Sequence, residues 1–301
     1  MLKIVGNRQA VYTLNCYVSK KMCANLTLIG PKGVGKYTAA RQIACELLGT
    51  TEEKLDIHPD SMIYSEEEPL KVEDISNIIE FTSLMPIKGD KKVILIDNAE
   101  KMSEAVQNKL LKSVEDNGNN VFIFVTSREL LGTIHSRTFN VAFQSLTEEE
   151  LLEYIESKGE TPPMPLGLYD GSVGRYEMLK SNDYLITTVS KLVETFQKLK
   201  DKSDFLEIFH EMKEKDKYEF YTMQKENTEM VIGFIKKIFS ELYFYKKYGE
   251  QGSINLECLN RSYSLEQVER IIEKCKNDQY ICRDNRYTKN DFFLLVALLT
   301  L

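Results

Sequence analysis

Short apolar runs alternate with amphipathic stretches along the first half of the chain. Four runs read as strands, at residues 26–29, 93–96, 121–125 and 139–143. Four stretches carry apolar residues at helical spacing, at residues 7–20, 39–48, 75–79 and 103–116. Continuous apolar runs are typical of parallel strands that are buried on both faces. The alternation therefore predicts a three-layer α/β domain with a parallel sheet, its elements joined by polar connections such as residues 50–56.

The pattern changes after Leu146. Acidic residues open a helix at 148–150, prolines interrupt the chain at 162–165, and residues 171–179 begin another short helix. From residue 184 onward the apolar stripes have helical spacing, as in 192–209 and in the tail 291–301. We therefore predict three domains, which are an α/β domain over residues 1–145, a small helical domain over 146–182, and an all-helical domain over 183–301.

Composition narrows the class of protein. The chain has 301 residues, 43% hydrophobic and 28% charged, which is ordinary for a globular protein of two or three domains. Its net charge of −7 argues against general coating of nucleic acid by this chain alone. The six cysteines lack zinc-binding spacing, so we expect free thiols in a reducing cytoplasm. We expect neither a signal peptide nor a membrane span, because the longest apolar run is far too short.

A glycine-rich turn separates the first predicted strand from the next helix. Its backbone N–H groups can surround a phosphate because three positions are glycine, namely Gly30, Gly33 and Gly35. Lys36 stands where a loop lysine reaches the β- and γ-phosphates. The next position normally holds a hydroxyl for Mg²⁺, but it is Tyr37, and Thr38 comes one residue too late. The loop is predicted to hold ATP or ADP without metal-assisted hydrolysis, and a glycine turn without phosphate function is the alternative.

A second candidate for chemistry follows the strand at residues 93–96. Asp97 occupies the place from which an acid would orient a water molecule on Mg²⁺. The general base of a hydrolytic site would follow directly, but Asn98 stands there, and an amide cannot take a proton from water. Glu100 comes two residues later and would point elsewhere. Together with Tyr37, this loss predicts that the site is not used for turnover.

Three segments resemble one known family. Residues 96–102, 107–116 and 133–138 read IDNAEKM, QNKLLKSVED and TIHSRT. With His58-Pro59-Asp60, they resemble bacterial clamp-loader subunits of the AAA+ class, and most closely the delta-prime subunits of DNA polymerase III. The resemblance covers nearly the whole chain and is weakest between residues 185 and 280. It implies a P-loop AAA+ domain, a helical lid over residues 146–182 and a helical collar for oligomerisation over residues 183–301.

The resemblance also implies roles for single residues. In this family a Ser-Arg-Cys motif carries an arginine finger that reaches the ATP of a neighbouring subunit, and Arg137 matches it, with Thr138 replacing the cysteine. Thr126 matches a polar nucleotide sensor, with strand capping as the alternative. The lid arginine of active members lies near Arg175, which is one residue late, and a helix-surface role is the alternative. Related subunits often carry a four-cysteine zinc module, but residues 49–57 contain no cysteine, so we predict no zinc.

The residues leave three functions open. We favour a non-hydrolysing subunit that joins gamma/tau-type and delta-type subunits, gives Arg137 to a partner's ATP site, and helps load the sliding clamp on primer–template DNA. The alternatives are an ATP-hydrolysing gamma/tau-like motor subunit and a free-standing P-loop nucleotide-binding regulator. Tyr37 and Asn98 argue against the motor, and a regulator would not need the Ser-Arg-Thr segment. In each case we expect a cytoplasmic protein.

Overall fold

The chain forms two compact units. The computed structural model describes residues 2–20, 22–65, 70–116, 118–164, 166–181, 186–187, 190, 225–249 and 256–283. The first unit comprises Met1–Gly159 and Gly171–Arg175, and the second comprises Glu160–Asp170 and Tyr176–Leu301. The domain boundaries at residues 145 and 182 stay predictions.

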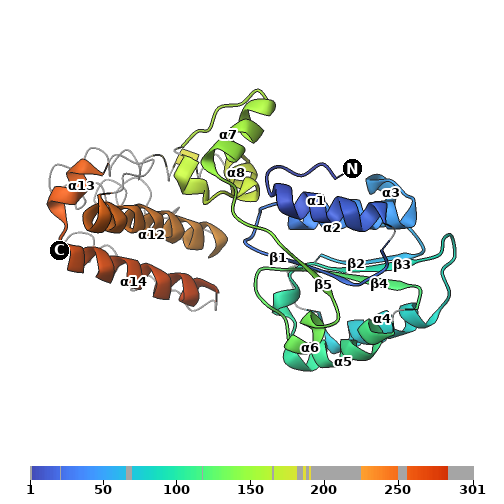
Figure 1. Ribbon diagram of the computed structural model, residues 1–301. Helices are drawn as coiled ribbons and strands as arrows, with labels where there is room; N and C mark the ends of the chain where they lie inside the picture. The colour runs from blue at the N-terminus through green and yellow to red at the C-terminus, as the bar shows by residue number, and fades with distance from the viewer. Residues whose placement is uncertain are drawn as a thin grey trace. The chain divides into compact units, whose positions relative to one another are not determined.

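The first unit is built on a parallel five-stranded sheet (Figure 1). Its strands are β1 (Leu26–Ile29), β2 (Ser61–Tyr64), β3 (Lys92–Ile96), β4 (Asn120–Thr126) and β5 (Phe139–Ala142). In space they follow the order β2-β3-β4-β1-β5, so β4 pairs with both β1 and β3. The parallel sheet confirms the predicted α/β fold, and its three apolar central strands are those that the sequence pattern marks most strongly.

The two edge strands differ from the sequence prediction. The sequence does not predict β2, because its four residues mix polar and apolar side chains and all are only half buried. The expectation of full burial for residues 139–143 is wrong, because β5 lies at the opposite edge and Phe139 is 36% exposed. A strand with a single neighbour keeps one side open to solvent, so its burial cannot match that of a central strand.

Helices cover both faces of the sheet (Figure 1). One face carries α1 (Arg8–Ser19), α2 (Lys36–Leu48) and α3 (Glu52–Leu55). The other carries α4 (Val72–Ser83), α5 (Glu104–Glu115) and α6 (Gly132–His135), with the 3₁₀ turn η1 (Ala99–Lys101) after β3. Ser103 caps α5 as predicted, because its Oγ accepts a hydrogen bond from the Val106 N–H. The three-layer arrangement is thereby confirmed.

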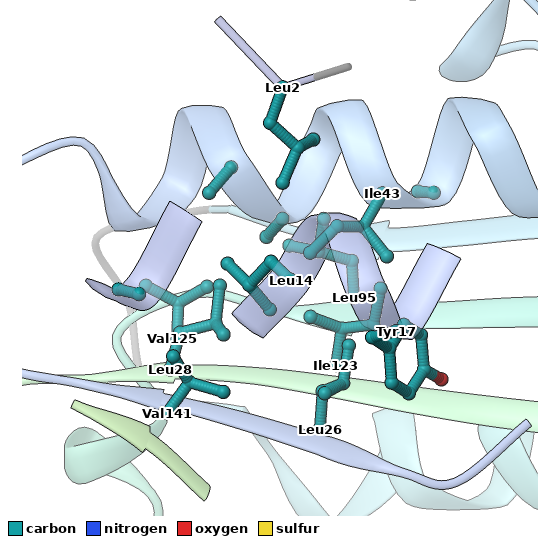
Figure 2. Packing of buried hydrophobic residues seen from close by; sticks show 14 of the residues in the cluster. Leu2, Leu14, Tyr17, Leu26, Leu28, Ile43, Leu95, Ile123, Val125 and Val141 are labelled. Atoms are coloured by element: carbon teal, nitrogen blue, oxygen red, sulfur yellow. The ribbon is translucent and has the colours of Figure 1, made fainter. Parts of the chain in front are cut away.

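The alternation of side chains along each strand divides the core into two. On the α1/α2 face, Leu14, Tyr17 and Ile43 pack over Leu26 and its neighbours in the sheet (Figure 2). On the α4/α5 face, the rings of Phe122 and Phe124 stack with their centroids 5.9 Å apart. Each fully buried side chain of this size contributes about 1.5–3 kcal/mol. Burial on both faces therefore explains why the central strands read as continuous apolar runs.

The connection at residues 50–56 contains a helical turn, α3, that its polar sequence does not predict. Leu55 is fully buried and anchors the turn in the core below α2. Arg41 of α2 reaches across and donates to both carboxylate oxygens of Asp56, at 2.8 and 2.9 Å. A buried leucine and a bidentate ion pair thus give this segment a fixed conformation.

The elements that the structure describes after the sheet are helical. In the first unit α7 (Glu148–Ser157) begins with a capping box, in which Thr147 and Glu150 each accept from the other's backbone N–H. Helix α8 (Val173–Lys180) begins in the first unit and continues into the second. The described elements of the second unit are η2 (Leu166–Tyr169), α12 (Lys225–Tyr248), α13 (Glu257–Ser262) and α14 (Leu265–Arg283).

The described helices of the second unit agree with the predicted fold class. Ile232, Ile235 and Phe239 of α12 are buried, and the Phe239 ring meets Tyr263 edge to face at 5.1 Å. Predicted features at residues 66–68, 192–209 and 291–301 lie outside the described residues. Within the described residues, none of the helices is both long and apolar enough to cross a membrane.

Asn25 connects three elements of the first unit. Its buried side chain donates to the Val114 carbonyl of α5 at 2.8 Å and accepts from the Phe122 N–H of β4 at 2.9 Å. Its carbonyl accepts from the Phe139 N–H of β5 at 2.7 Å. The end of α5 and the start of two strands are thus joined by one amide side chain and its backbone.

Replacing Asn25 by alanine should destabilise the protein by about 2–4 kcal/mol, because two buried backbone groups lose their partner. Chemical denaturation followed by far-UV circular dichroism measures this change. The control is Asn108→Ala on the exposed side of α5, which should change stability by no more than about 0.5 kcal/mol. Equal stability of the two variants would contradict the role given to Asn25.

Candidate functional site

The glycine loop adopts backbone conformations that its glycines alone permit. The φ angles are 153° at Gly30, 74° at Gly33 and 93° at Gly35, which is the residue that precedes α2. A Cβ at Gly30 would lie 2.2 Å from the Phe143 carbonyl oxygen, and one at Gly33 would lie 2.2 Å from Ser172 Oγ. Two of the three glycines are therefore required by the packing of this chain itself, whether or not a phosphate binds.

The segment Gly171–Arg175 contacts the glycine loop directly. Ser172 Oγ donates to the Lys32 carbonyl at 3.1 Å, and the Gly174 N–H donates to the Gly33 carbonyl at 2.9 Å. The Arg175 N–H donates to Ser172 Oγ at 3.1 Å. The backbone that carries Arg175 is thus attached to the loop, and the role of its side chain as a nucleotide sensor stays a prediction.

Lys36 directs its ammonium group to the loop that precedes it. Nζ donates to the carbonyl oxygens of Gly30 at 2.6 Å and Pro31 at 2.5 Å, and the residue is only 5% exposed. Burial lowers the pKa of this amine, while the Glu100 and Asp97 carboxylates favour its charged form. To reach a phosphate, the ammonium would have to exchange these two carbonyl partners for phosphate oxygens.

The two hydroxyl groups after Lys36 lie apart from it. The Tyr37 hydroxyl accepts from Arg41 Nη1 at 3.4 Å, and the guanidinium lies 5.8 Å from the centre of the tyrosine ring. Tyr37 therefore packs toward the Arg41–Asp56 pair, and Thr38 is exposed on α2. In the part of the chain that the structure describes, no three His, Cys, Asp or Glu side chains gather as a metal site requires.

Asp97 is half buried at the end of β3, beside the loop. Burial raises the pKa of its carboxyl group, and a backbone hydrogen bond from Asn98 works against that rise. The Asn98 amide also donates to Asp97 Oδ2 at 3.1 Å, from a residue in the left-handed conformation. Asn98 is therefore a donor to the acid that precedes it, and it offers no base.

Near the carboxyl ends of the strands, the Glu100 carboxylate forms hydrogen bonds with Ser127, and the Thr126 hydroxyl forms hydrogen bonds with Arg128. The Glu100 carboxylate accepts from Ser127 Oγ at 2.7 Å and from the Ser127 N–H at 3.1 Å. Burial would raise the pKa of Glu100, but these hydrogen bonds hold it below its ordinary value. The Thr126 hydroxyl donates to the Arg128 carbonyl at 2.6 Å and accepts from its N–H at 3.3 Å. Such bonds are those of a residue that caps a strand, and the sensor role of Thr126 stays a prediction.

Arg137 lies at the amino ends of the parallel strands, whereas the glycine loop lies at their carboxyl ends. Arg137 precedes β5, whose first residue Phe139 is paired with Leu26 at the start of β1, whereas the loop follows the end of β1. A parallel strand of four residues is about 13 Å long, so the two ends of the strands are separated by about this length. The sheet thus brings the glycines, Lys36, Asp97 and Thr126 to the carboxyl ends of its strands and Arg137 to the amino ends.

The surroundings of Arg137 include residues that sequence reasoning did not assign a role. The buried Gln107 of α5 accepts from the Leu131 N–H at 2.9 Å, which fixes the start of α6. Thr138 accepts a hydrogen bond from Thr27 Oγ1 at 2.9 Å, so the residue in the cysteine position is bonded to β1. Arg137 Nη2 pairs with Glu115 Oε1 at 2.7 Å. Gln107 and Glu115 lie in a segment that resembles the family, but nothing in their spacing indicates these tertiary contacts.

Comparison with known families supports the resemblance. Residues 6–147 match the family model described as "DNA polymerase III, delta subunit", which covers most of the first unit. The match confirms the resemblance to clamp-loader subunits over the α/β region. Together with the relatives below, it makes the α/β region of this chain similar to that of clamp-loader subunits.

Curated relatives agree with this resemblance, and a solved structure shares the fold. Replication factor C subunit 2 of Arabidopsis thaliana is 28% identical over 177 residues, which are 56% of this chain and 52% of the relative. A replication factor C small subunit of Methanococcus maripaludis is 29% identical over 170 residues, or 54% and 52% of the two chains. The chain thus spans about half the length of the curated relatives it matches. A DNA polymerase III gamma subunit-related protein of Thermotoga maritima has the same fold, with a TM-score of 0.57, 16% identity, and coverage of 95% and 98%.

The raised pKa of Asp97 gives a stability prediction. A carboxyl whose pKa is higher in the folded than in the unfolded state favours folding only while it is protonated, and this contribution is lost as the pH rises through its folded pKa. Asp97→Asn is neutral at every pH and keeps an oxygen for the Asn98 amide. Its Tm should exceed that of the wild type at pH 7, and the difference should vanish near pH 4, about the ordinary pKa of aspartate.

Thermal unfolding of both proteins from pH 4 to pH 8 measures this difference. Asp90→Asn, at an exposed position, is the control and should follow the wild type throughout. A lower Tm for Asp97→Asn at pH 7, or a difference that does not change with pH, would contradict the burial argument.

Proposed function

We propose that this chain is a delta-prime-like clamp-loader subunit that does not hydrolyse ATP and gives Arg137 to the ATP site of a neighbouring subunit. The observation that carries the proposal is the place of Arg137, across the sheet from the loop of its own chain. A guanidinium stabilises the charge that develops on a γ-phosphate only at direct contact distance. Arg137 is 38% exposed, so a second subunit can approach it.

The loop itself supports binding without turnover. Lys36 is bonded to two carbonyl groups of the loop, and Tyr37 and Asn98 replace the groups that hold Mg²⁺ and activate water. ATP or ADP remains the nucleotide class that three glycines and a lysine would suit. The runner-up function is a gamma/tau-like motor subunit, and these two replacements count against it. A free-standing regulator would have no use for Arg137.

The proposed partners are gamma/tau-type and delta-type subunits, the sliding clamp, and primer–template DNA bound by the assembled ring. Within this proposal, residues 146–182 are the lid and residues 183–301 the collar through which the subunits assemble. Such an assembly acts in the cytoplasm. The net charge of −7 fits a subunit that meets DNA through the complex and not by itself.

An exposed apolar segment after α4 offers a surface for contact with another protein. Leu84, Met85 and Ile87 lie close together in the chain, and their side chains are 60%, 75% and 73% exposed. The buried Asp60 carboxylate fixes this segment by accepting from the Ile87 and Lys88 N–H groups, both at 2.7 Å. Large apolar side chains held rigidly in solvent mark an interaction surface. We assign this surface to the clamp.

Arg137→Ala tests the main proposal in a complex reconstituted with the partner subunits, the clamp and primed DNA. The variant should fold and assemble, while DNA-stimulated ATP hydrolysis and clamp loading fall steeply, since such a finger contributes on the order of 10³–10⁵ in rate in other P-loop systems. Arg137→Lys should rescue little, because lysine lacks the planar fork. The isolated wild-type chain should show no ATPase activity above background.

Arg8→Ala, at an exposed position on α1, is the matched control for loss of a charge. Unchanged hydrolysis and loading with Arg137→Ala would remove the proposed function. A steady ATPase activity of the isolated chain that Lys36→Ala abolishes would favour the motor subunit instead.

The clamp surface is tested by the double variant Met85→Ser and Ile87→Ser. Each apolar side chain that leaves water is worth about 1.5–3 kcal/mol, so the Kd for the clamp should rise at least about tenfold. The Tm should not change, because both side chains are exposed. Surface plasmon resonance on the immobilised clamp measures the Kd, and Ile57→Ser, also at an exposed position, is the control. Equal Kd values for both variants would assign the surface to another partner.

A further inference from the structure

Arg137 is held by its own chain on three sides. Nη1 donates to the Thr133 carbonyl at 2.9 Å and to Ser136 Oγ at 3.3 Å, both within the turn formed by α6. Nη2 pairs with Glu115 Oε1 at 2.7 Å. In the described part of the chain, Nε makes no further hydrogen bond. Glu115 is therefore the contact that ties the guanidinium to a second element, α5.

Glu115 occupies a position that helix energetics disfavour. It is the last residue of α5, where the carbonyl end of the helix carries partial negative charge and favours a cation. Arg137 compensates for this unfavourable placement by bringing a positive charge to the helix end. A residue that opposes its local preference and is matched by one specific tertiary partner is what a functional position leads us to expect.

We propose that Glu115 is a positioning residue for Arg137, an inference that rests on the function proposed above. An arginine side chain has several rotatable bonds, and fixing its plane before a phosphate arrives avoids an ordering cost during the reaction. Two hydrogen bonds from Nη1 and the ion pair of Nη2 with Glu115 restrain the plane of the guanidinium. Its Nε–H and second Nη2–H are left for the oxygens of a phosphate bound by the neighbouring subunit.

The same geometry predicts that Glu115 matters little for folding. The side chains of Arg137 and Glu115 are 38% and 50% exposed, and an ion pair at that exposure is worth about 0–1 kcal/mol. Removing Glu115 also removes an acid from the end of α5. Loss of activity in a Glu115 variant would therefore come from the arginine and not from an unfolded subunit.

The experiment measures steady-state ATP hydrolysis in the reconstituted complex with Glu115→Ala, Glu115→Gln and Arg137→Ala. Glu115→Ala should lower kcat about tenfold at the site that Arg137 serves and leave KM for ATP nearly unchanged, because a displaced group mainly costs transition-state stabilisation. Glu115→Gln keeps an oxygen of similar position beside Nη2 without the negative charge and should recover part of the loss. Asp116→Ala removes the neighbouring exposed acid and should behave as the wild type.

A double variant separates positioning from a general structural effect. If Glu115 acts only through Arg137, then Glu115→Ala combined with Arg137→Ala should be no slower than Arg137→Ala alone. Wild-type hydrolysis with Glu115→Ala, while Arg137→Ala is slow, would overturn the inference. Faster hydrolysis would also overturn it and would identify Glu115 as a restraint on the finger. If Arg137→Ala is itself unaffected, the proposed function fails first, and the positioning role fails with it.

Discussion

Parallel strand pairing is the constraint on which the rest of the first unit depends. All five strands run in one direction. Every chain segment that follows a strand therefore lies at the carboxyl end of the sheet, and every segment that precedes a strand lies at its amino end. The glycine loop follows β1 and Asp97 follows β3, so they meet. Arg137 precedes β5 and is kept away from them. One hydrogen-bonding pattern thus separates the glycine loop from Arg137, which fits the proposal that Arg137 serves a neighbouring subunit.

The polar groups beside the glycine loop are largely buried, and they form hydrogen bonds with other groups of the same chain. Lys36 is bonded to loop carbonyls, Asp97 to Asn98, and Thr126 to Arg128. Burial makes each of these bonds necessary, since an unpaired polar group in this environment costs about 1–3 kcal/mol. Glycines at 30 and 33 are needed because other backbone and side-chain atoms lie where a Cβ would be. The loop can therefore persist as a structural element, and the proposed loss of hydrolysis does not require the loss of its shape.

The surroundings of Arg137 are built differently, mainly from contacts between residues far apart in the chain that meet at the turn formed by α6. Asn25 fixes the end of α5 against two strands, and Gln107 fixes the start of α6. Glu115 and Thr133 then fix the guanidinium that follows. All of these contacts except the one from Thr133 join residues far apart in the chain, so the geometry around Arg137 depends on how α5 and the strands pack. This dependence fits a group whose use requires a defined orientation toward another subunit.

The sequence by itself determined the elements whose patterns are local. Continuous apolar runs give β1, β3 and β4, the helical spacing gives α1 and α5, and Ser103 marks the start of α5, because burial and capping act over a few residues. It also predicts site roles for Gly30, Lys36, Asp97 and Arg137, and these roles stay predictions. Only the tertiary structure decided that residues 139–143 form an edge strand, that Leu55 anchors a helical turn, and that Lys36 binds its own loop. The pairing of Glu115 with Arg137 is of the same kind, since it exists only where the sheet brings the end of α5 beside the turn before β5.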